Sequence, residues 1–240
     1  MPAKNQSIIY LMAINVLIFI ASTWLKFESL QSLALYFPLN EKFALWQLVT
    51  HMFMHGSVAH ILFNMYALWS FGTPLEQTWK TPRFLAFYFV TGLGAALIYT
   101  AANYYQFSAI TNDILTLGYS TNDIQTILQQ GMADGHLVQA LGKDRLVEFM
   151  SIYHAPVVGA SGAMYGVLVA FAMRYPDAKL SLIFLPVPIS AKWFVPLIIA
   201  GDLFFGLTKY SVGNIAHFAH VGGAITALVI MLVVRYRQKQ

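Results

Sequence analysis

The sequence predicts an all-α membrane protein in which six transmembrane helices form one bundle, with a polar insert between the third and the fourth. Of its 240 residues, 58% are hydrophobic and 10% are charged, whereas about 25% of residues are charged in a typical soluble domain. The mean hydropathy of +0.61 points the same way. This length holds about six spans of ~20 residues with loops. No change in composition marks a second domain, so we treat residues 1–240 as one membrane domain.

The first predicted span covers about residues 8–25. It lacks the small-residue cleavage site of a secretory signal peptide, so we expect it to be retained. Residues 26–47 mix apolar residues with Pro38, Glu41 and Lys42, and we expect them to form a loop at the membrane surface.

The second predicted span covers about residues 58–73, and the third covers about residues 84–107. Two histidines, His51 and His55, lie just before the second span. A short polar turn joins the two spans and contains Lys80, Pro82 and Arg83.

Residues 108–154 interrupt the membrane pattern and form the predicted polar insert. They carry five acidic residues, which are Asp113, Asp123, Asp134, Asp144 and Glu148. Ser120, with Asp123 three residues later, is an N-cap pattern, and the apolar residues that follow have helical spacing. Residues 143–153 are expected to form another short helix.

The last three predicted spans cover about residues 157–175, 193–208 and 215–234. Pro186 and Pro188 lie in the link between the fourth and the fifth, where proline interrupts a helix.

Basic residues indicate the topology, because Lys and Arg are retained on the cytoplasmic side of a membrane. With both termini cytoplasmic, nine of them lie inside: Lys4, Lys80, Arg83, Arg174, Lys179, Lys192, Arg235, Arg237 and Lys239. Five lie outside: Lys26, Lys42, Lys143, Arg145 and Lys209. The bias predicts cytoplasmic termini and an insert on the outer side.

Ser161 lies between glycines at the start of the fourth span. A serine needs a neighbouring base before it is nucleophilic at neutral pH. His220 lies about a turn and a half into the sixth span from the same side, so the two residues have matching depth. We predict that Ser161 and His220 form a catalytic pair inside the membrane.

Other polar residues within the spans are functional candidates, because a polar group in hydrocarbon is costly unless it is paired. His60 and Asn64 are four residues apart and share one helical face. Both can donate hydrogen bonds to an oxygen that becomes negative during acyl transfer. Tyr165 lies one turn after Ser161, and we expect its ring to pack on the imidazole of His220 and orient it.

Small residues let helices approach closely in lipid. Gly162 and Gly166 form such a face on the fourth span, and Gly223 and Ala227 lie on a similar face of the sixth span with His220. We expect these two faces to pack together and so to bring Ser161 within reach of His220.

A two-residue dyad is the simplest prediction, because no Asp or Glu is expected at the depth of His220. Asp202 in the fifth span is half of what an aspartyl intramembrane protease would need, but no second membrane aspartate accompanies it. We expect Asp202 to make a local hydrogen bond.

Two alternatives concern histidines. His217 could be the base instead of His220, but only His220 has an alanine before it and glycines after it. His51 and His55 could bind a metal, but no third ligand or HExxH glutamate accompanies them, so a structural role is preferred. No cofactor and no metal are predicted.

The motifs resemble those of the rhomboid intramembrane serine proteases over about residues 45–234. The segment Gly159-Ala160-Ser161-Gly162 is similar to the family's GxSG nucleophile motif, and Ala219-His220 with the following glycines is similar to its general-base motif. The segment His60-Ile61-Leu62-Phe63-Asn64 resembles its HxxxN element.

The resemblance implies roles for these residues. Ser161 would attack the peptide bond, and His220 would take and return the proton. His60, Asn64 and the backbone amide of Ser161 would stabilise the oxyanion, and Tyr165 would pack on the base. The sequence departs from the family pattern at Gln47, where many members have Arg, and at Lys80, where glycine is frequent.

The resemblance also implies a serine endopeptidase that cleaves membrane proteins, expected to be single-span, in or near their transmembrane segments. We expect substrates to enter from the lipid bilayer between the second and fifth spans. The expected location is a bacterial cytoplasmic (inner) membrane, with the active site open to the outer side. The oligomeric state and the role of the insert are left open.

Other function classes are weighed against this one. The same scaffold could be a catalytically silent binder of membrane helices, which the sequence does not separate from the protease. A transporter is disfavoured because no inverted repeat or pair of broken helices is visible. A nucleic-acid partner is not expected, because the net charge is only +4 and the basic residues are scattered.

Overall fold

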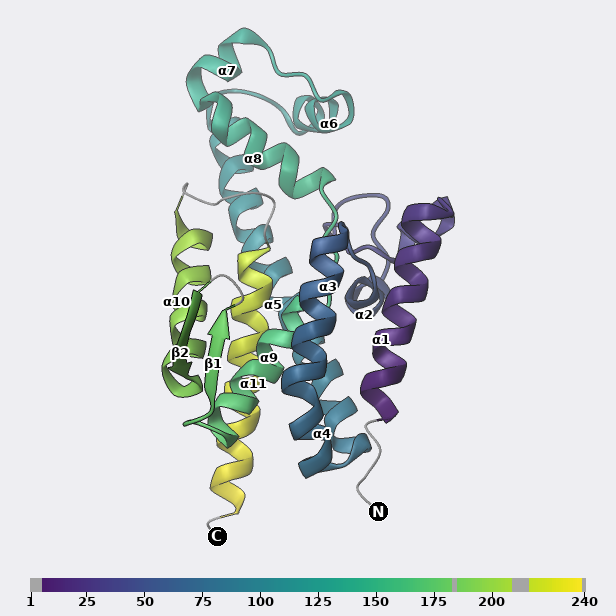
Figure 1. Cartoon of the computed structure of the whole chain (residues 1–240). Helices are drawn as coiled ribbons and strands as arrows, with labels where there is room; N and C mark the ends of the chain where they lie inside the picture. The colour runs from purple at the N-terminus through teal and green to yellow at the C-terminus, as the bar shows by residue number, and fades with distance from the viewer. Residues whose placement is uncertain (1–5, 183–184, 209–215, 239–240) are drawn as a thin grey trace.

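The computed structural model describes residues 6–182, 185–208 and 216–238. Long helices form a bundle, and a group of short helices lies at one end of it (Figure 1). The start of α1 and the end of α11 both lie at the opposite end of the bundle. Among the described residues, the fold is therefore mostly helical, as predicted.

Three of the described helices are long and apolar enough to cross a membrane. The first is α1 (Gln6–Phe19), which continues through the π-helical turn η1 (Ile20–Trp24). The others are α5 (Thr81–Thr116) and α11 (His217–Arg237). They contain the first and third predicted spans and most of the sixth, whose predicted start at Ile215 lies outside the described residues.

The other three predicted spans coincide with shorter helices. The second consists of α3 (Val58–Ala67), the π-helical η4 (Leu68–Gly72) and α4 (Thr73–Trp79), which follow one another directly. The fourth is α9 (Ser161–Arg174), with 14 residues, and the fifth is α10 (Ala191–Leu207), with 17 residues. The count of six membrane crossings therefore stays a prediction.

The all-α prediction is wrong between α9 and α10. There, β1 (Lys179–Leu182) and β2 (Leu185–Ser190) pair as an antiparallel hairpin, with Lys179 opposite Ser190. Proline fixes φ near −65° and favours an extended conformation in the residue before it. Pro186 and Pro188 thus make this link extended rather than helical.

The predicted start of the insert at residue 108 coincides with no break in the helix, because α5 continues to Thr116. The bounds of the insert stay a prediction. Ile110 and Ile114 of this extension belong to a second hydrophobic cluster that it shares with the insert. Within that cluster the rings of Phe107 and Phe149 stack with centroids 4.6 Å apart. Burial of these side chains favours continuing the helix beyond the apolar span.

Three short helices form the rest of the insert: α6 (Thr121–Gln130), α7 (Gly135–Leu141) and α8 (Lys143–His154). The predicted N-cap is confirmed, since the Ser120 hydroxyl accepts the backbone N–H of Asp123 and the Asp123 carboxylate accepts the backbone N–H of Ser120. The predicted helix near residues 143–153 is confirmed by α8. The short helix α7 was not predicted.

The first loop contains the 3₁₀ helices η2 (Glu28–Leu33) and η3 (His51–Phe53), with α2 (Gln47–Thr50) between them. Gln47 is fully buried and organises this loop. Its Nε2 donates to the carbonyls of Ser32 and Lys42, at 3.1 and 2.8 Å, and its Oε1 accepts the backbone N–H of Tyr36 at 3.2 Å. A neutral amide therefore supplies the hydrogen bonds of this loop at the position where the family resemblance leads us to expect Arg.

Lys80, the other departure from the family pattern, lies between α4 and α5 with φ of +67°. Residues with a side chain rarely adopt this left-handed region, whereas glycine adopts it freely. The local backbone thus explains why glycine suits this position.

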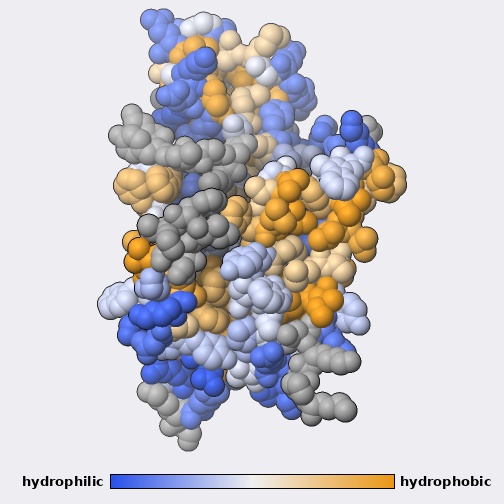
Figure 2. Space-filling model, viewed as in Figure 1, coloured by the Kyte–Doolittle hydropathy of each residue, from blue (hydrophilic) through white to orange (hydrophobic). Residues whose placement is uncertain are grey.

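At the centre of the bundle, α9 has ten of its 14 residues buried. A helix that is apolar on all sides is enclosed by other helices. It packs against α5 and α11, which carry exposed apolar side chains on their outer faces. On the face shown in Figure 2, hydrophobic residues gather at mid-height over α1 and α3, and hydrophilic residues gather towards the two ends. This distribution suits a protein embedded in a bilayer.

Candidate active site

Ser161 is the first residue of α9, and the segment before it is held by the first loop. Leu35 and Val157 exchange two backbone hydrogen bonds, of 2.9 and 2.8 Å. The backbone N–H of Gly159 donates to the carbonyl of His51 at 2.9 Å. Gly159 has φ of +131°, which only glycine adopts readily. The serine is therefore presented on a braced turn at a helix start, where the first backbone N–H groups have no partner within the helix.

His220 lies within the first turn of α11 and faces Ser161. Its Nε2 lies 2.9 Å from the Oγ of Ser161, which is hydrogen-bond distance. The two residues that the sequence pairs by motif and depth are thus brought together, although 59 positions separate them. The proposed alternative, His217, has its Nδ1 2.6 Å from an oxygen of Asp202 instead.

Close contact of the helix backbones makes this approach possible. A Cβ added to Gly223 of α11 would lie 1.9 Å from the carbonyl oxygen of Gly162 of α9, so no side chain fits there. The expected contact between these two helices is therefore present at Gly162 and Gly223. The expected role of Gly166 is wrong, because an added Cβ would meet Thr91 of α5 at 2.6 Å. Gly166 is one turn further along α9, and α5 rather than α11 covers that face.

Tyr165 lies against the imidazole of His220, as expected. The two rings are stacked, with centroids 4.3 Å apart and planes inclined by 9°. The hydroxyl of Tyr165 donates to the Oδ2 of Asp202. Tyr165 therefore restrains His220 through its ring and Asp202 through its hydroxyl.

His60 and Asn64 both lie on α3, and His60 reaches the turn before the serine. Ser57 caps α3 by accepting the backbone N–H of His60 at 3.1 Å. The Nε2 of His60 lies beside Gly159, where an added Cβ would be 2.7 Å from it. Asn64 follows one turn later and is buried, and its Nδ2 has no hydrogen-bond partner among the described residues. A buried donor without a partner is costly, and it is available to an acceptor that enters the site.

The prediction that no acidic residue lies beside the base is wrong. The carboxylate of Asp202, on α10, has its Oδ1 3.1 Å from the Nδ1 of His220. Asp202 is only 8% exposed. The sequence did contain a signal for Asp202, because an ionisable residue in an apolar span is a functional candidate by default. Its partner could not be read from the sequence, because nothing in the spacing of α10 and α11 says which of their faces meet.

Comparison with known protein families identifies the family of the chain. The family model described as "Rhomboid domain" matches residues 42–123 and 125–237, which is most of the chain. The chain belongs to the rhomboid family.

Several curated rhomboid relatives are similar over part of their length. The mitochondrial presenilin-associated rhomboid-like protein A of Danio rerio is 30% identical over 183 residues, which is 74% of this chain and 34% of that protein. The mitochondrial rhomboid protein 1 of Saccharomyces cerevisiae is 28% identical over 178 residues, 74% of this chain and 38% of that protein. The chain thus spans well under half the length of these two relatives.

A bacterial relative matches a shorter segment. The rhomboid protease GluP of Bacillus subtilis is 38% identical over 52 residues, which is 22% of this chain and 10% of that protein. Because the longer matches are to mitochondrial proteins, the predicted bacterial inner membrane is not supported. The coarser statement, that this is a membrane protein, stands.

One cluster in this rhomboid site could hold a metal ion among the residues that the structure describes. Asp202, His217 and His220 each offer a ligand atom, and these atoms lie within 4.8 Å of one another. Their hydrogen bonds to one another already account for the arrangement. His51 and His55 take no part in this group: the Nδ1 of His51 lies 2.8 Å from the carbonyl of Gln47, and the ring of His55 meets His60 edge-on.

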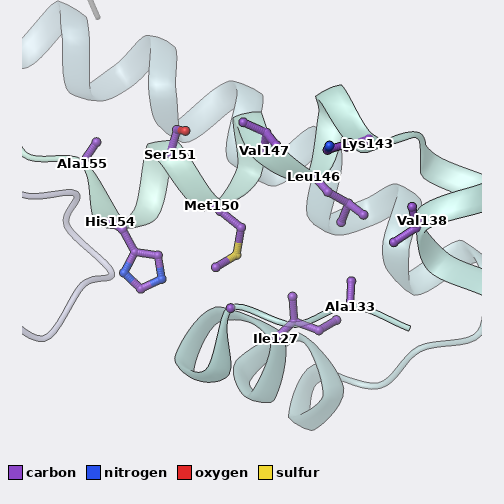
Figure 3. Close-up of a pocket in the computed structure, with 11 residues that line it drawn as sticks. Ile127, Ala133, Val138, Lys143, Leu146, Val147, Met150, Ser151, His154 and Ala155 are labelled. Carbon is purple, nitrogen blue, oxygen red and sulfur yellow. The ribbon is translucent and has the colours of Figure 1, made fainter. Parts of the chain in front are cut away.

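One cavity in the described part of the rhomboid chain lies away from this site. It has a volume of about 510 Å³ and is formed in the insert by α6, α7 and α8, with Ile127, Leu146 and Met150 among its lining residues (Figure 3). Neither Ser161 nor His220 borders it. This cavity therefore belongs to the insert and not to the candidate active site.

Proposed function

We propose that this chain is an intramembrane serine endopeptidase that hydrolyses peptide bonds in or near the transmembrane segments of other membrane proteins. The observation that carries the proposal is the 2.9 Å distance between the Oγ of Ser161 and the Nε2 of His220 at the start of a buried helix. Membership of the rhomboid family supports it, and one relative is named a rhomboid protease.

The proposed reaction begins when the Oγ of Ser161 attacks the carbonyl carbon of the scissile bond. Its proton passes to the Nε2 of His220 as the new C–O bond forms, and the carbonyl oxygen becomes an oxyanion. His220 then gives this proton to the leaving amine as the C–N bond breaks. A water molecule resolves the acyl-enzyme in the same way, with His220 again taking and returning a proton.

The oxyanion would be stabilised by donors on two helices. His60 and Asn64 project from α3, and the backbone N–H of Ser161 lies at the start of α9. Preorganised donors of this kind act strongly in a site from which bulk water is excluded. The unpartnered Nδ2 of Asn64 supports this role, because a developing oxyanion supplies the acceptor that it lacks.

The proposed setting is a six-span bundle with both termini on one side of the membrane. The insert, and the mouth of the active site, would lie on the other side. Three residues in the charge count that favours this topology, Lys4, Lys209 and Lys239, lie outside the described residues. The expected substrates are single-span membrane proteins that enter from the lipid, and no cofactor is required by the proposed chemistry.

The test combines covalent labelling and cleavage in reconstituted membranes. A fluorophosphonate probe should label the wild-type protein at Ser161, and a single-span model substrate should be cleaved. Ser161→Ala and His220→Ala should each abolish both signals, because each removes one member of a unit that acts together. His217→Ala should retain most activity. A wild-type chain that is folded but neither labelled nor active would instead favour the silent binder of membrane helices.

A further inference from the structure

Asp202 lies at the meeting point of three side chains from α9 and α11. Its Oδ1 is 2.6 Å from the Nδ1 of His217 and 3.1 Å from the Nδ1 of His220. Its Oδ2 accepts the hydroxyl of Tyr165. A carboxylate oxygen has two lone pairs, so Oδ1 can accept from both imidazoles at once.

This contact decides which nitrogen of His220 carries the proton. A carboxylate only accepts hydrogen bonds, so the Nδ1 of His220 must be the protonated nitrogen. The Nε2 then has a free lone pair, and it is this atom that lies 2.9 Å from the Oγ of Ser161. The opposite tautomer would place a hydrogen on Nε2 and leave the base unable to accept the serine proton.

We propose that Asp202 is a positioning residue for His220, so that the site works as a unit of Ser161, His220 and Asp202 rather than as a dyad. This proposal rests on the proposed protease function. Asp202 holds the Nδ1–H tautomer and lies next to the positive imidazolium that forms when Ser161 gives up its proton. Asp202 takes no proton itself.

The surroundings restrain Asp202 so that it can act in this way. Its side chain is 9% exposed, so water does not compete freely for its oxygens. Tyr165 holds Oδ2 and covers one face of the imidazole, while His217 provides the second donor to Oδ1. The angle and the tautomer of His220 are thus set together by α9 and α10.

The first experiment compares kcat and KM of the wild type, Asp202→Asn and Asp202→Ala with a model substrate in one membrane. Asp202→Ala should lower kcat by about 10³- to 10⁴-fold, as loss of the third member does in other serine hydrolases. Asp202→Asn should lower kcat to a similar extent, because its amide N–H can donate to the Nδ1 of His220 and so favour the tautomer with hydrogen on Nε2. KM should change little, because Asp202 lies behind the imidazole. The matched control is Asp177→Asn, an exposed carboxylate paired with Lys192, which should be silent.

The second experiment reads the tautomer directly, by nuclear magnetic resonance of ¹⁵N-labelled histidine in the Ser161→Ala protein. His220 should carry its proton on Nδ1, and this signature should be lost on adding Asp202→Ala. This measurement does not depend on activity, so it tests the positioning role of Asp202 even if the chain proves not to be a protease. Asp202→Asn serves where Asp202→Ala does not fold.

The outcomes separate the two proposals. No labelling of Ser161 in the wild type would overturn the proposed function. Normal kcat in both Asp202 variants, with loss of activity in Ser161→Ala and His220→Ala, would overturn only the role of Asp202. A fall in kcat that follows a loss of thermal stability, with an unchanged histidine tautomer, would reduce Asp202 to a structural residue and would also overturn this proposal.

Discussion

Tyr165 and His220 form a stacked pair, with ring centroids 4.3 Å apart and an angle of 9° between the planes. Tyr165 comes from α9, one turn after Ser161, and His220 comes from α11. The helix that carries the nucleophile therefore also carries the ring that fixes the base. This arrangement predicts that the ring and the hydroxyl of Tyr165 make separate contributions to the activity.

Tyr165→Phe should keep the stacked ring and lose only the hydrogen bond to Asp202, so we expect activity to fall by no more than about tenfold. Tyr165→Ala should remove both restraints, and misplacement of a catalytic group by ~1 Å can cost about 10²-fold in rate. The measurement is kcat for both variants on one model substrate, with thermal stability recorded alongside. Equal activity of the two variants would show that the ring does not hold the imidazole.

The proposed oxyanion donors predict an effect on turnover rather than on substrate binding. His60→Ala and Asn64→Ala should each lower kcat, by something on the order of 10²-fold if each behaves as a typical donor. KM should change little in either variant. The control on the same helix is Leu62→Ala, because this side chain is 63% exposed on the outer face of α3. Wild-type turnover in the double variant His60→Ala with Asn64→Ala would exclude α3 from the mechanism.

The contact between Gly162 and Gly223 predicts sensitivity to a single methyl group. Gly223→Ala should force α11 away from α9, because the new Cβ would lie 1.9 Å from a carbonyl oxygen. We expect both activity and thermal stability to fall, although no polar group has changed. Gly201→Ala, in α10, is the matched control, since no atom lies within 4 Å of its added Cβ. It should be neutral or slightly stabilising, because alanine restricts the unfolded chain. Similar behaviour of the two variants would mean that α9 and α11 do not meet as described.

The capping box at the start of α6 predicts a pH dependence in the insert. Hydrogen bonds from the backbone and the hydroxyl of Ser120 hold the pKa of the Asp123 carboxyl below its ordinary value of 3.8. A lowered folded-state pKa stabilises the helix above the ordinary value, and this contribution is lost as the pH falls through the lower, folded-state pKa. Hydrogen exchange at the amides of α6 should therefore show protection that weakens below about pH 4, after correction for intrinsic rates.

The matched variant for this prediction is Asp123→Ala, which removes the titrating group. Its α6 amides should be less protected at neutral pH, and the loss of protection on acidification should be smaller than in the wild type. The amides of α9 serve as an internal reference, since that helix belongs to the other hydrophobic cluster. An identical acid response in wild type and variant would assign the pH dependence to another group.

Much of this protein was determined by local features of its sequence. Long apolar runs decide that α1, α5 and α11 are helices suited to a membrane, and the Ser120–Asp123 pattern decides where α6 begins. The pairing of Ser161 with His220 could be predicted because both lie near the same end of their spans. These properties depend on composition, helical period and depth in the membrane. All three can be read from residues that are close together in the sequence.

Only the tertiary structure decided which helix faces meet. It placed Asp202 of α10 behind His220, and it turned Gly166 towards α5 instead of α11. It also extended α5 into the insert, because Ile110 and Ile114 find apolar partners there. In a helix that is apolar on nearly every side, no stripe marks the face that packs on a given neighbour. That choice comes from the fit of side chains across helices far apart in the chain, and so it cannot be read from any one segment.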